Sequence, residues 1–249
     1  MNAGDLVKAS LGRFGLIALR KSHPAAPYLA DPPRSALDSI LLRVFRELHG
    51  LRFLQIGAND GVRADPVRAK VLRHEWTGLL VEPLPPLFAQ LQANYSGRPG
   101  LDFLNAAVDV TAGTRKLYFI RPGLPGIPDW AGGLGSFDLL RLRQAASELK
   151  LDEAAIAEQT VPTVTWDDLR RRFGPRPCDL LVIDTEGYDL TLLRAALLAR
   201  WRPRVIQFEH ACSPADERLA IYGELLALGY EIASDEGDTV AWLRQPAAA

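Results

Sequence analysis

The chain has 249 residues, enough for one large domain or for one domain with an extension. Its hydrophobic content of 48% is sufficient for a packed core, and its formal net charge of −1 gives no long-range attraction to nucleic acid. No basic stripe with interleaved aromatic residues is visible, so a nucleic-acid partner is not expected. The two cysteines, Cys178 and Cys212, are too few for a disulfide framework or a zinc site, which predicts a reducing, cytoplasmic location.

The first fifty residues are predicted to be a helical extension, and the main domain is predicted at 51–249. Residues 4–20 have the pattern of an amphipathic basic helix, which either packs on its own domain or a partner, or lies on a membrane surface. Residues 23–33 are rich in proline and predict a linker, and 39–48 predict a second helix. No apolar run is long enough to span a bilayer, and no cleavable signal pattern is visible at the start.

The main domain is organised around the stretch 53–61, where a short apolar strand runs into a glycine turn. Asp65 and Pro66 then suit the N-cap and the first position of a helix. Gly57 lets the chain leave the strand sharply, and Gly61 lets the backbone approach a ligand closely. A strand, a glycine turn and a helix in this order present backbone N–H groups to a nucleotide-type cofactor. The turn lacks the third glycine of the dinucleotide fingerprint and the Lys-Ser/Thr of a P-loop, so an ordinary strand-to-helix turn remains the alternative.

Glu82 closes the next predicted strand, 78–82, about twenty residues beyond the glycine turn. Doubly wound folds place a carboxylate at that spacing on the ribose hydroxyls of a bound nucleotide. We favour that role over the alternative, a solvated carboxylate at a strand end. The proline cluster that follows predicts a helix through Asn94.

Strands predicted at 101–108 and 116–120 are followed by an irregular stretch. Residues 122–135 are rich in glycine and proline and contain Trp130, a composition typical of a functional loop such as a lid over an active site. We therefore predict an acceptor-loop insertion at about 121–160, with a charged helix filling its second half.

The rest of the chain alternates strands with helices. The later strands are predicted at 161–164, 179–183, 204–208, 230–234 and 239–243, and the last two form a hairpin. This alternation predicts a mostly parallel sheet with helices on both faces and an antiparallel edge. Ligands bind at the carboxyl ends of the strands in such sheets. Polar residues close four of the strands there: Asn59 with Asp60, Glu82, Asp184 with Glu186, and Glu209 with His210.

Taken together, these motifs resemble those of the FkbM-type S-adenosylmethionine-dependent methyltransferase family. The motifs are Gly57-Ala58-Asn59-Asp60-Gly61, Val81-Glu82-Pro83, Gly135-Ser136-Phe137-Asp138, Asp184-Thr185-Glu186-Gly187-Tyr188-Asp189 and Phe208-Glu209-His210. The resemblance covers about 53–243. It implies a class I methyltransferase fold, which is α/β, Rossmann-like and doubly wound, with a mostly parallel seven-stranded sheet whose last strand is antiparallel. It also implies methyl transfer from S-adenosylmethionine to an oxygen of a small-molecule or glycan acceptor, typically a sugar or a secondary metabolite.

The resemblance also implies roles for individual residues. The turn formed by Gly57, Ala58, Asn59, Asp60 and Gly61 holds the methionine part of the cofactor. Glu82 takes the ribose hydroxyls, while Asn105 and Ala106 border the adenine. Ser136 is a candidate for the acceptor side of the cleft.

An alcohol acceptor needs help to lose its proton, because its pKa lies far above 7. The candidate catalytic residues are Asp184, Glu186, Glu209 and His210. His210 could act as a general base, or the three carboxylates could hold a Mg²⁺ that lowers the pKa of the hydroxyl. His210 could equally be satisfied by backbone groups, and Glu186 could only cap a helix. We favour a metal-free mechanism, in which the carboxylates position the acceptor by hydrogen bonds.

Two other functions remain open. A nicotinamide-dependent oxidoreductase would also use Glu82, but the missing third glycine and the absence of a Tyr-x-x-x-Lys pair count against it. A non-catalytic binding module with this fold has no need of costly clustered carboxylates. The sequence makes no prediction about oligomeric state.

Overall fold

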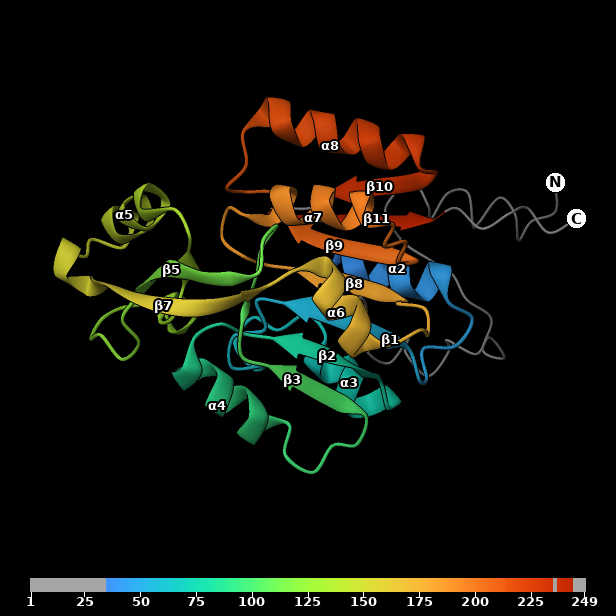
Figure 1. Ribbon diagram of the computed structural model, residues 1–249, viewed down its shortest axis with the longest axis horizontal. Helices are drawn as coiled ribbons and strands as arrows, with labels where there is room; N and C mark the ends of the chain where they lie inside the picture. The colour runs from blue at the N-terminus through green and yellow to red at the C-terminus, as the bar shows by residue number, and fades with distance from the viewer. Residues whose placement is uncertain (1–34, 235–236, 244–249) are drawn as a thin grey trace, which may run out of the picture.

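The computed structural model describes residues 35–234 and 237–243. The helix predicted at 4–20 and the linker predicted at 23–33 lie outside the described residues. Within them, a large sheet flanked by helices forms the body of the molecule, and a smaller sheet projects from one end of it (Figure 1).

The large sheet has seven strands in the order β10-β11-β9-β8-β1-β2-β3. Their bounds are β1 Arg52–Ile56, β2 Thr77–Val81, β3 Leu101–Leu104, β8 Leu180–Ile183, β9 Val205–Glu209, β10 Tyr230–Ser234 and β11 Asp238–Leu243. Strand β11 is antiparallel to both of its neighbours, and the other pairs are parallel. The predicted mostly parallel seven-stranded sheet with an antiparallel last strand is therefore confirmed, as is its closing hairpin.

Helices cover both faces of this sheet, so its central strands β1, β2, β8 and β9 are buried on two sides. Their bounds are α2 Ala36–Val44, α3 Arg68–His74, α4 Pro85–Asn94, α6 Trp166–Phe173, α7 Asp189–Leu198 and α8 Ala215–Ala227. Alternate residues of β1 show the two faces: Leu54 and Ile56 belong to the core under α6, α7 and α8, and Phe53 to the core under α2 and α3. This double burial explains why the strands are near-continuous apolar runs.

Local signals in the sequence start several helices where expected. The Thr165 side chain and Asp168 form a complete capping box at α6. Pro85 stands at the first position of α4, which ends at Asn94 as predicted. Asp65 lies two residues before the N-cap of α3, yet its Oδ1 accepts the N–H groups of Val67 and Arg68 at 2.7 and 2.9 Å. It therefore does cap the helix.

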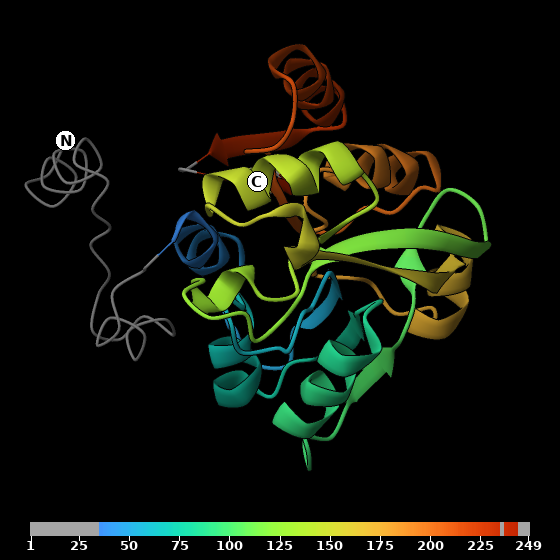
Figure 2. The same ribbon diagram turned by 90° about the vertical axis from the view of Figure 1, so that its left-hand side faces the viewer.

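The smaller sheet has four strands in the order β4-β7-β5-β6. Its elements are β4 Ala107–Val108, β5 Gly113–Ile120, β6 Gly135–Ser136 and β7 Ile156–Val164, with α5 Leu139–Glu148 and the short 3₁₀ turns η2 Asp129–Ala131 and η3 Glu153–Ala155. Strands β5 and β7 pair antiparallel along the whole length of β5. Figure 2 shows this sheet and α5 on the side of the molecule that faces the viewer.

Two predictions about this region are wrong. The strand expected at 101–108 divides after Leu104, and its second part joins the smaller sheet as β4. The charged helix ends at Glu148, and the strand β7 begins already at Ile156. Ala157, Glu158 and Gln159 have high helix propensity, but they pair with β5, and this pairing overrides the local preference.

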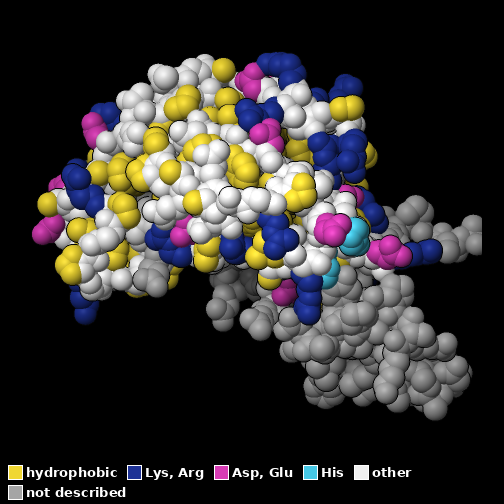
Figure 3. Space-filling model, turned by 90° about the horizontal axis from the view of Figure 1, so that it is seen from below, with side chains coloured by type: hydrophobic (Ala, Val, Ile, Leu, Met, Phe, Trp, Pro, Cys, Tyr) yellow, Lys and Arg dark blue, Asp and Glu magenta, His cyan; other side chains and the backbone are white. Residues whose placement is uncertain are grey.

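The surface carries both signs of charge. On the face shown in Figure 3, Lys and Arg side chains are spread among hydrophobic, uncharged and acidic ones. Among the helices that the described residues form, none is both long enough and apolar enough to cross a membrane.

Candidate active site

A cavity of about 270 Å³ lies at the carboxyl ends of β1, β2 and β8, beneath the smaller sheet. This volume is close to the lower end of the range for small-molecule pockets, roughly 300–1,000 Å³. The predicted site residues that line it are Gly57, Ala58, Asn59, Glu82, Ala106, Asp184 and Glu186. Asp60, Gly61, Asn105, Ser136, Glu209 and His210 are not among its lining residues.

Gly57 is the first residue after β1, and Asp184 is the first residue after the neighbouring strand β8. The φ of Gly57 is +80°, and a Cβ at this position would stand 1.7 Å from the carbonyl oxygen of Asp184. Only glycine fits here, as the sequence suggested. Gly61 has a different reason for being glycine, because a Cβ there would meet side-chain atoms of Leu91 and Tyr95 at 2.6 and 2.7 Å. The close approach at Gly61 is thus to side chains of α4 and of its C-terminal end.

Asn59 and Asp60 shape the turn from within. Asn59 has a positive φ of 48°, and its Oδ1 accepts the N–H of Asp60 at 2.7 Å. The Asp60 carboxylate turns away from the cavity and accepts the N–H groups of Val62 and Arg63 and the Arg63 Nε. Burial raises the pKa of Asp60, but the hydrogen bonds from Arg63 outweigh it and hold the pKa below its ordinary value. Asp60 therefore supports the turn.

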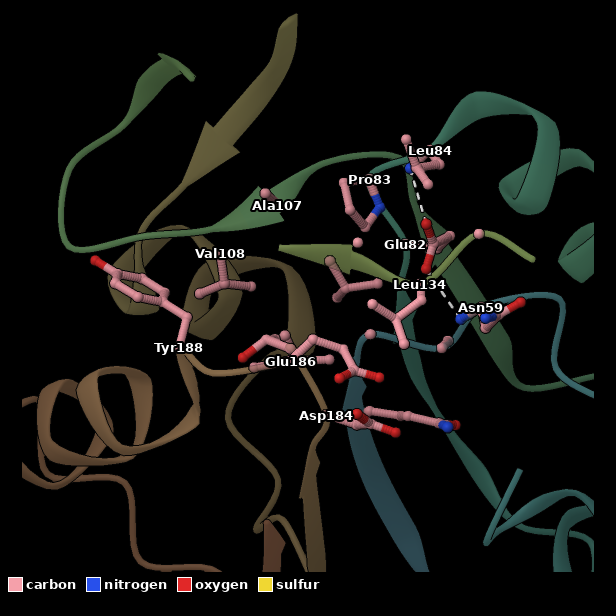
Figure 4. A pocket seen from close by; sticks show the side chains of 18 of the residues that line it. Asn59, Glu82, Pro83, Leu84, Ala107, Val108, Leu134, Asp184, Glu186 and Tyr188 are labelled. Atoms are coloured by element: carbon pink, nitrogen blue, oxygen red, sulfur yellow. Dashed lines mark hydrogen bonds between the residues drawn. The ribbon is translucent and has the colours of Figure 1, made fainter. Parts of the chain in front are cut away.

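Glu82 lies almost fully buried beside this turn, with 4% of its surface exposed. Its Oε2 accepts the N–H of Asn59 at 2.9 Å, and its Oε1 accepts the N–H of Leu84 at 2.8 Å (Figure 4). Burial raises the pKa of Glu82 to about 7, against the lowering effect of these two bonds. A carboxylate has about four lone-pair sites, so each oxygen keeps one for a ligand.

Beyond Glu82 the cavity wall becomes apolar. Ala106, Val108 and Leu84 contribute to this wall. The Asn105 side chain donates to the carbonyl oxygens of Glu82 and Pro83 at 2.8 and 3.0 Å. Asn105 therefore joins the end of β3 to the end of β2, and it is not among the residues that line the cavity.

Asp184 and Glu186 form the acidic side of the cavity. Solvent reaches the Asp184 side chain through the cavity, while protein encloses it on its other sides. This enclosure, together with the carboxylates of Asp189 and Glu186, raises the pKa of Asp184 well above its ordinary value. Burial and then the charge of Glu209 raise the pKa of Glu186 to about 7. Figure 4 shows the two side chains next to each other in the cavity.

An arginine from the smaller sheet's helix balances part of this charge. Arg141, on α5, places its Nη2 3.3 Å from Glu186 Oε2 and donates its Nε to Cys212 Sγ at 3.0 Å. Glu209 Oε1 accepts a hydrogen bond from the Cys212 thiol at 3.6 Å. Burial raises the pKa of both Glu209 and Cys212. Sequence reasoning missed Arg141, because one of several arginines on a charged helix gives no distinguishing signal.

The predicted Mg²⁺ ligand set does not come together as expected. In the described part of the chain, the potential ligand atoms that lie within 4.8 Å of one another belong to Glu186, Glu209 and Cys212, and Asp184 is not among them. Mg²⁺ prefers hard oxygen ligands over a thiol. The Arg141 guanidinium already brings a positive charge to this group.

His210 and Ser136 serve the framework around the site. The Nδ1 of His210 lies 3.0 Å from the Thr239 hydroxyl, and its backbone N–H donates to Gly237. His210 is buried between β9 and the hairpin and does not reach the cavity lining. Ser136 is also buried and donates its hydroxyl to the carbonyl oxygen of Glu186 at 2.8 Å. It thereby positions Glu186, and the structure gives it no face toward an acceptor.

Two further residues hold the acidic loop in shape. Asp189 accepts hydrogen bonds from the Thr185 N–H and hydroxyl and from the Gly187 N–H, and burial raises its pKa to about 8. Tyr188 lines the cavity and donates its hydroxyl to Asp109 at 2.8 Å. Both residues belong to the motif 184–189, which the sequence analysis identified. Their individual hydrogen bonds could be assigned only from the structure.

The family model for the methyltransferase FkbM domain matches residues 55–243, about three quarters of the chain. The chain belongs to the FkbM methyltransferase family. Its fold is that of the class I S-adenosylmethionine-dependent methyltransferases, with the glycine turn, Glu82 and Asp184 at the edge where that fold binds its ligands. The family membership supports methyl transfer over nicotinamide-dependent hydride transfer.

Three solved structures that match the chain are distant from it in sequence. The methyltransferase FkbM from Methylobacillus flagellatus KT is 12% identical, with a TM-score of 0.47, and the match covers 78% of this chain and 43% of that one. Aeropyrum pernix fibrillarin in complex with S-adenosyl-L-methionine is 14% identical, with a TM-score of 0.41 and coverages of 84% and 74%. The N-terminal domain of human METTL16 is 10% identical, with a TM-score of 0.46 and coverages of 98% and 83%. The chain thus spans less than half the length of the first of these, and no curated protein matches it.

Proposed function

We propose that this FkbM-family chain is an O-methyltransferase that uses S-adenosylmethionine to methylate a hydroxyl of a sugar, a glycan or a secondary metabolite. One observation carries the proposal. The carboxylate of Glu186, whose pKa is raised to about 7, lies beside Asp184 in the same cavity as Glu82 and the Gly57 turn. One side of the cavity, with the Gly57 turn and Glu82, thus suits a nucleotide-type cofactor. The other side, with Asp184 and Glu186, suits removal of a proton from the acceptor.

Glu82 fits the ribose of this cofactor. Its two oxygens each accept one backbone N–H and keep one free lone-pair site, which suits two neighbouring hydroxyl groups. Hydrogen bonds from the two ribose hydroxyls would also stabilise the charged form of Glu82, whose pKa burial now raises. Ala106, Val108 and Leu84 offer an apolar surface for a flat base, and the turn at Gly57 would hold the methionine part. When bound, S-adenosylmethionine supplies a methyl group already activated on its sulfonium sulfur.

With the methyl group activated, this chain's own task is to align the acceptor and to take its proton. A general base works best when its pKa lies near the operating pH, which favours Glu186. Asp184 lies next to it and would hold the hydroxyl by a hydrogen bond. His210 has less support as the base, because it is buried against Thr239 and does not line the cavity. A Mg²⁺ at the carboxylates has less support too, since Arg141 is already paired with Glu186.

The raised pKa values also favour an enzyme over a non-catalytic binding module. Carboxylates held close together in a partly buried cavity cost stability, and such clusters concentrate at functional sites.

Calorimetric titration tests the cofactor directly. The wild-type chain should release heat on binding S-adenosylhomocysteine, the demethylated product, and should give none with NAD⁺. A Glu82→Ala variant should bind S-adenosylhomocysteine more weakly by roughly 1.5–3 kcal/mol, the usual worth of hydrogen bonds to a charged group. Binding of NAD⁺ alone would refute the proposal.

A further inference from the structure

Trp130 is the exception among the five tryptophans of the chain. Its surface is 52% exposed, whereas the other four, Trp76, Trp166, Trp201 and Trp242, are between 1% and 7% exposed. The indole belongs to the turn η2 between β5 and β6, and it lines the cavity. A large aromatic side chain left open to solvent beside a ligand cavity indicates a contact with something that binds there.

The backbone that carries Trp130 is held in place on both sides. Ala131 is fully buried, and its N–H donates to Pro128 at 3.0 Å. Gly133 donates its N–H to Ile120 at 3.0 Å, which fixes the loop to β5. The Arg63 Nη1 donates to the Gly132 carbonyl at 3.1 Å, while the Arg63 Nε pairs with Asp60 in the glycine turn. The exposure of the indole is therefore not the result of a loose loop.

The cofactor assignment proposed above leaves the indole unused. The apolar wall assigned to the adenine consists of Leu84, which follows β2, of Ala106, which directly precedes β4, and of Val108, which lies within β4. Trp130 enters the cavity from a different element, the turn η2 in the loop between β5 and β6. A ligand contacting Trp130 would therefore be the acceptor.

The chemistry of the cavity narrows the acceptor class. Carboxylates such as Asp184 and Glu186 accept hydrogen bonds from neighbouring hydroxyls, and the indole of Trp130 offers a flat, electron-rich face. A pyranose ring is complementary to both features. Its rim carries hydroxyls that can donate to the carboxylates, and its face carries a patch of C–H groups that can lie on the indole. Such C–H groups are attracted to an aromatic face and bury apolar surface against it.

We propose that Trp130 is the stacking surface for the pyranose ring of a sugar acceptor. This inference rests on the proposed function and narrows its acceptor to a sugar. Trp130 then determines specificity, and Asp184 and Glu186, in the loop after β8, face the hydroxyl that receives the methyl group.

Because the other four indoles are buried, acrylamide quenching of tryptophan fluorescence reports mainly on Trp130. The probes are S-adenosylhomocysteine alone, then S-adenosylhomocysteine with each of a set of methyl pyranosides, and then with sorbitol. Sorbitol carries comparable hydroxyls but has no ring face. We expect at least one pyranoside to reduce quenching, and S-adenosylhomocysteine alone or sorbitol to leave it unchanged.

Kinetics with the same pyranoside provides the second measurement. Trp130→Ala should raise KM at least ~10-fold with kcat within about threefold, and Trp130→Phe should restore most of the affinity. Leu140→Ala, at an exposed apolar residue of α5, is the matched control and should behave as wild type. Shielding by S-adenosylhomocysteine alone would make Trp130 a cofactor residue and overturn the inference. If S-adenosylhomocysteine binds but no pyranoside shields Trp130, the inference fails while the proposed function stands.

Discussion

The carbonyl oxygen of Asp184 occupies the space that a Cβ on Gly57 would need, with only 1.7 Å between the two positions. The contact joins the first residue after β1 to the first residue after β8, strands that are paired parallel in the centre of the sheet. It brings the nucleotide-type turn and the acidic side of the cavity into direct backbone contact. The glycine is therefore required by the assembly of the site as well as by the turn.

Gly57→Ala should destabilise the chain and abolish binding of S-adenosylhomocysteine. The methyl group would collide with backbone atoms, so β1 and β8 would have to separate, and the positive φ adds strain. Gly97→Ala is the matched control, because Gly97 has a similar φ of +76° and open space around it. Urea denaturation should show a loss of roughly 1 kcal/mol for the control and clearly more for Gly57→Ala. Equal losses would show that the contact with Asp184 is unimportant.

Glu82→Gln should weaken binding of S-adenosylhomocysteine by roughly 1.5–3 kcal/mol, because the amide loses the charge and one of the two acceptor oxygens. Glu217→Gln, at an exposed residue in the first turn of α8, is the control. Calorimetry of both variants gives the two affinities. An affinity for Glu82→Gln equal to that of the control would remove Glu82 from the ribose site.

Much of the fold could be predicted because each central strand is a short apolar run that ends in a polar residue. The strand that ends at Ile56 before the glycine turn and the strand that ends at Ile183 are of this kind. Both predicted strands are confirmed. The sequence predicts strands at 116–120 and 161–164 but not that they form a separate sheet, and it misses the first half of the longest strand, Ile156–Val164, because Ala157, Glu158 and Gln159 favour a helix. Its position is determined by long-range pairing with β5, which local patterns do not encode.

The candidate site, like the fold, contains residues that the sequence could predict and residues that it could not. Position at a strand end was sufficient to predict that Glu82, Asp184 and Glu186 lie near one another, because parallel strands bring their carboxyl ends to one edge, and all three line the cavity. Strand-end position was not sufficient for His210, whose side chain turns toward Thr239 in the hairpin. Arg141 could not be found at all, since its contact with Glu186 depends on how α5 packs over the sheet.

The stability of the ligand-free chain should fall as the pH rises from about 5 to about 8. Burial raises the pKa values of Glu82 and Glu186 to about 7 and that of Asp189 to about 8, so the folded state holds more protons than the unfolded state in this window. Under linkage, stability then decreases with increasing pH. Asp189→Asn should flatten the upper part of this decrease. Denaturation midpoints measured across the window provide the test, and a midpoint that rises with pH would contradict the buried carboxylates.

Arg141→Met should move the acidic limb of the pH–rate profile to higher pH. The guanidinium lowers the pKa of Glu186, so its removal leaves the carboxylate protonated over a wider range. Arg143→Met is the control, because Arg143 lies on the same helix but pairs with the exposed Glu153. If both variants keep the wild-type limb, Glu186 is not the group that controls the rate.

The most direct measurement is the product of the reaction itself. The chain is incubated with S-adenosylmethionine carrying an isotope-labelled methyl group and with methyl pyranosides or hydroxylated secondary metabolites, and NMR locates the label. We expect the label on an acceptor oxygen, with turnover reduced ~10²-fold or more in Glu186→Gln and nearly unchanged in His210→Ala. Label on nitrogen or carbon, or equal turnover in wild type and Glu186→Gln, would contradict the proposed methyl transfer to a hydroxyl activated by Glu186.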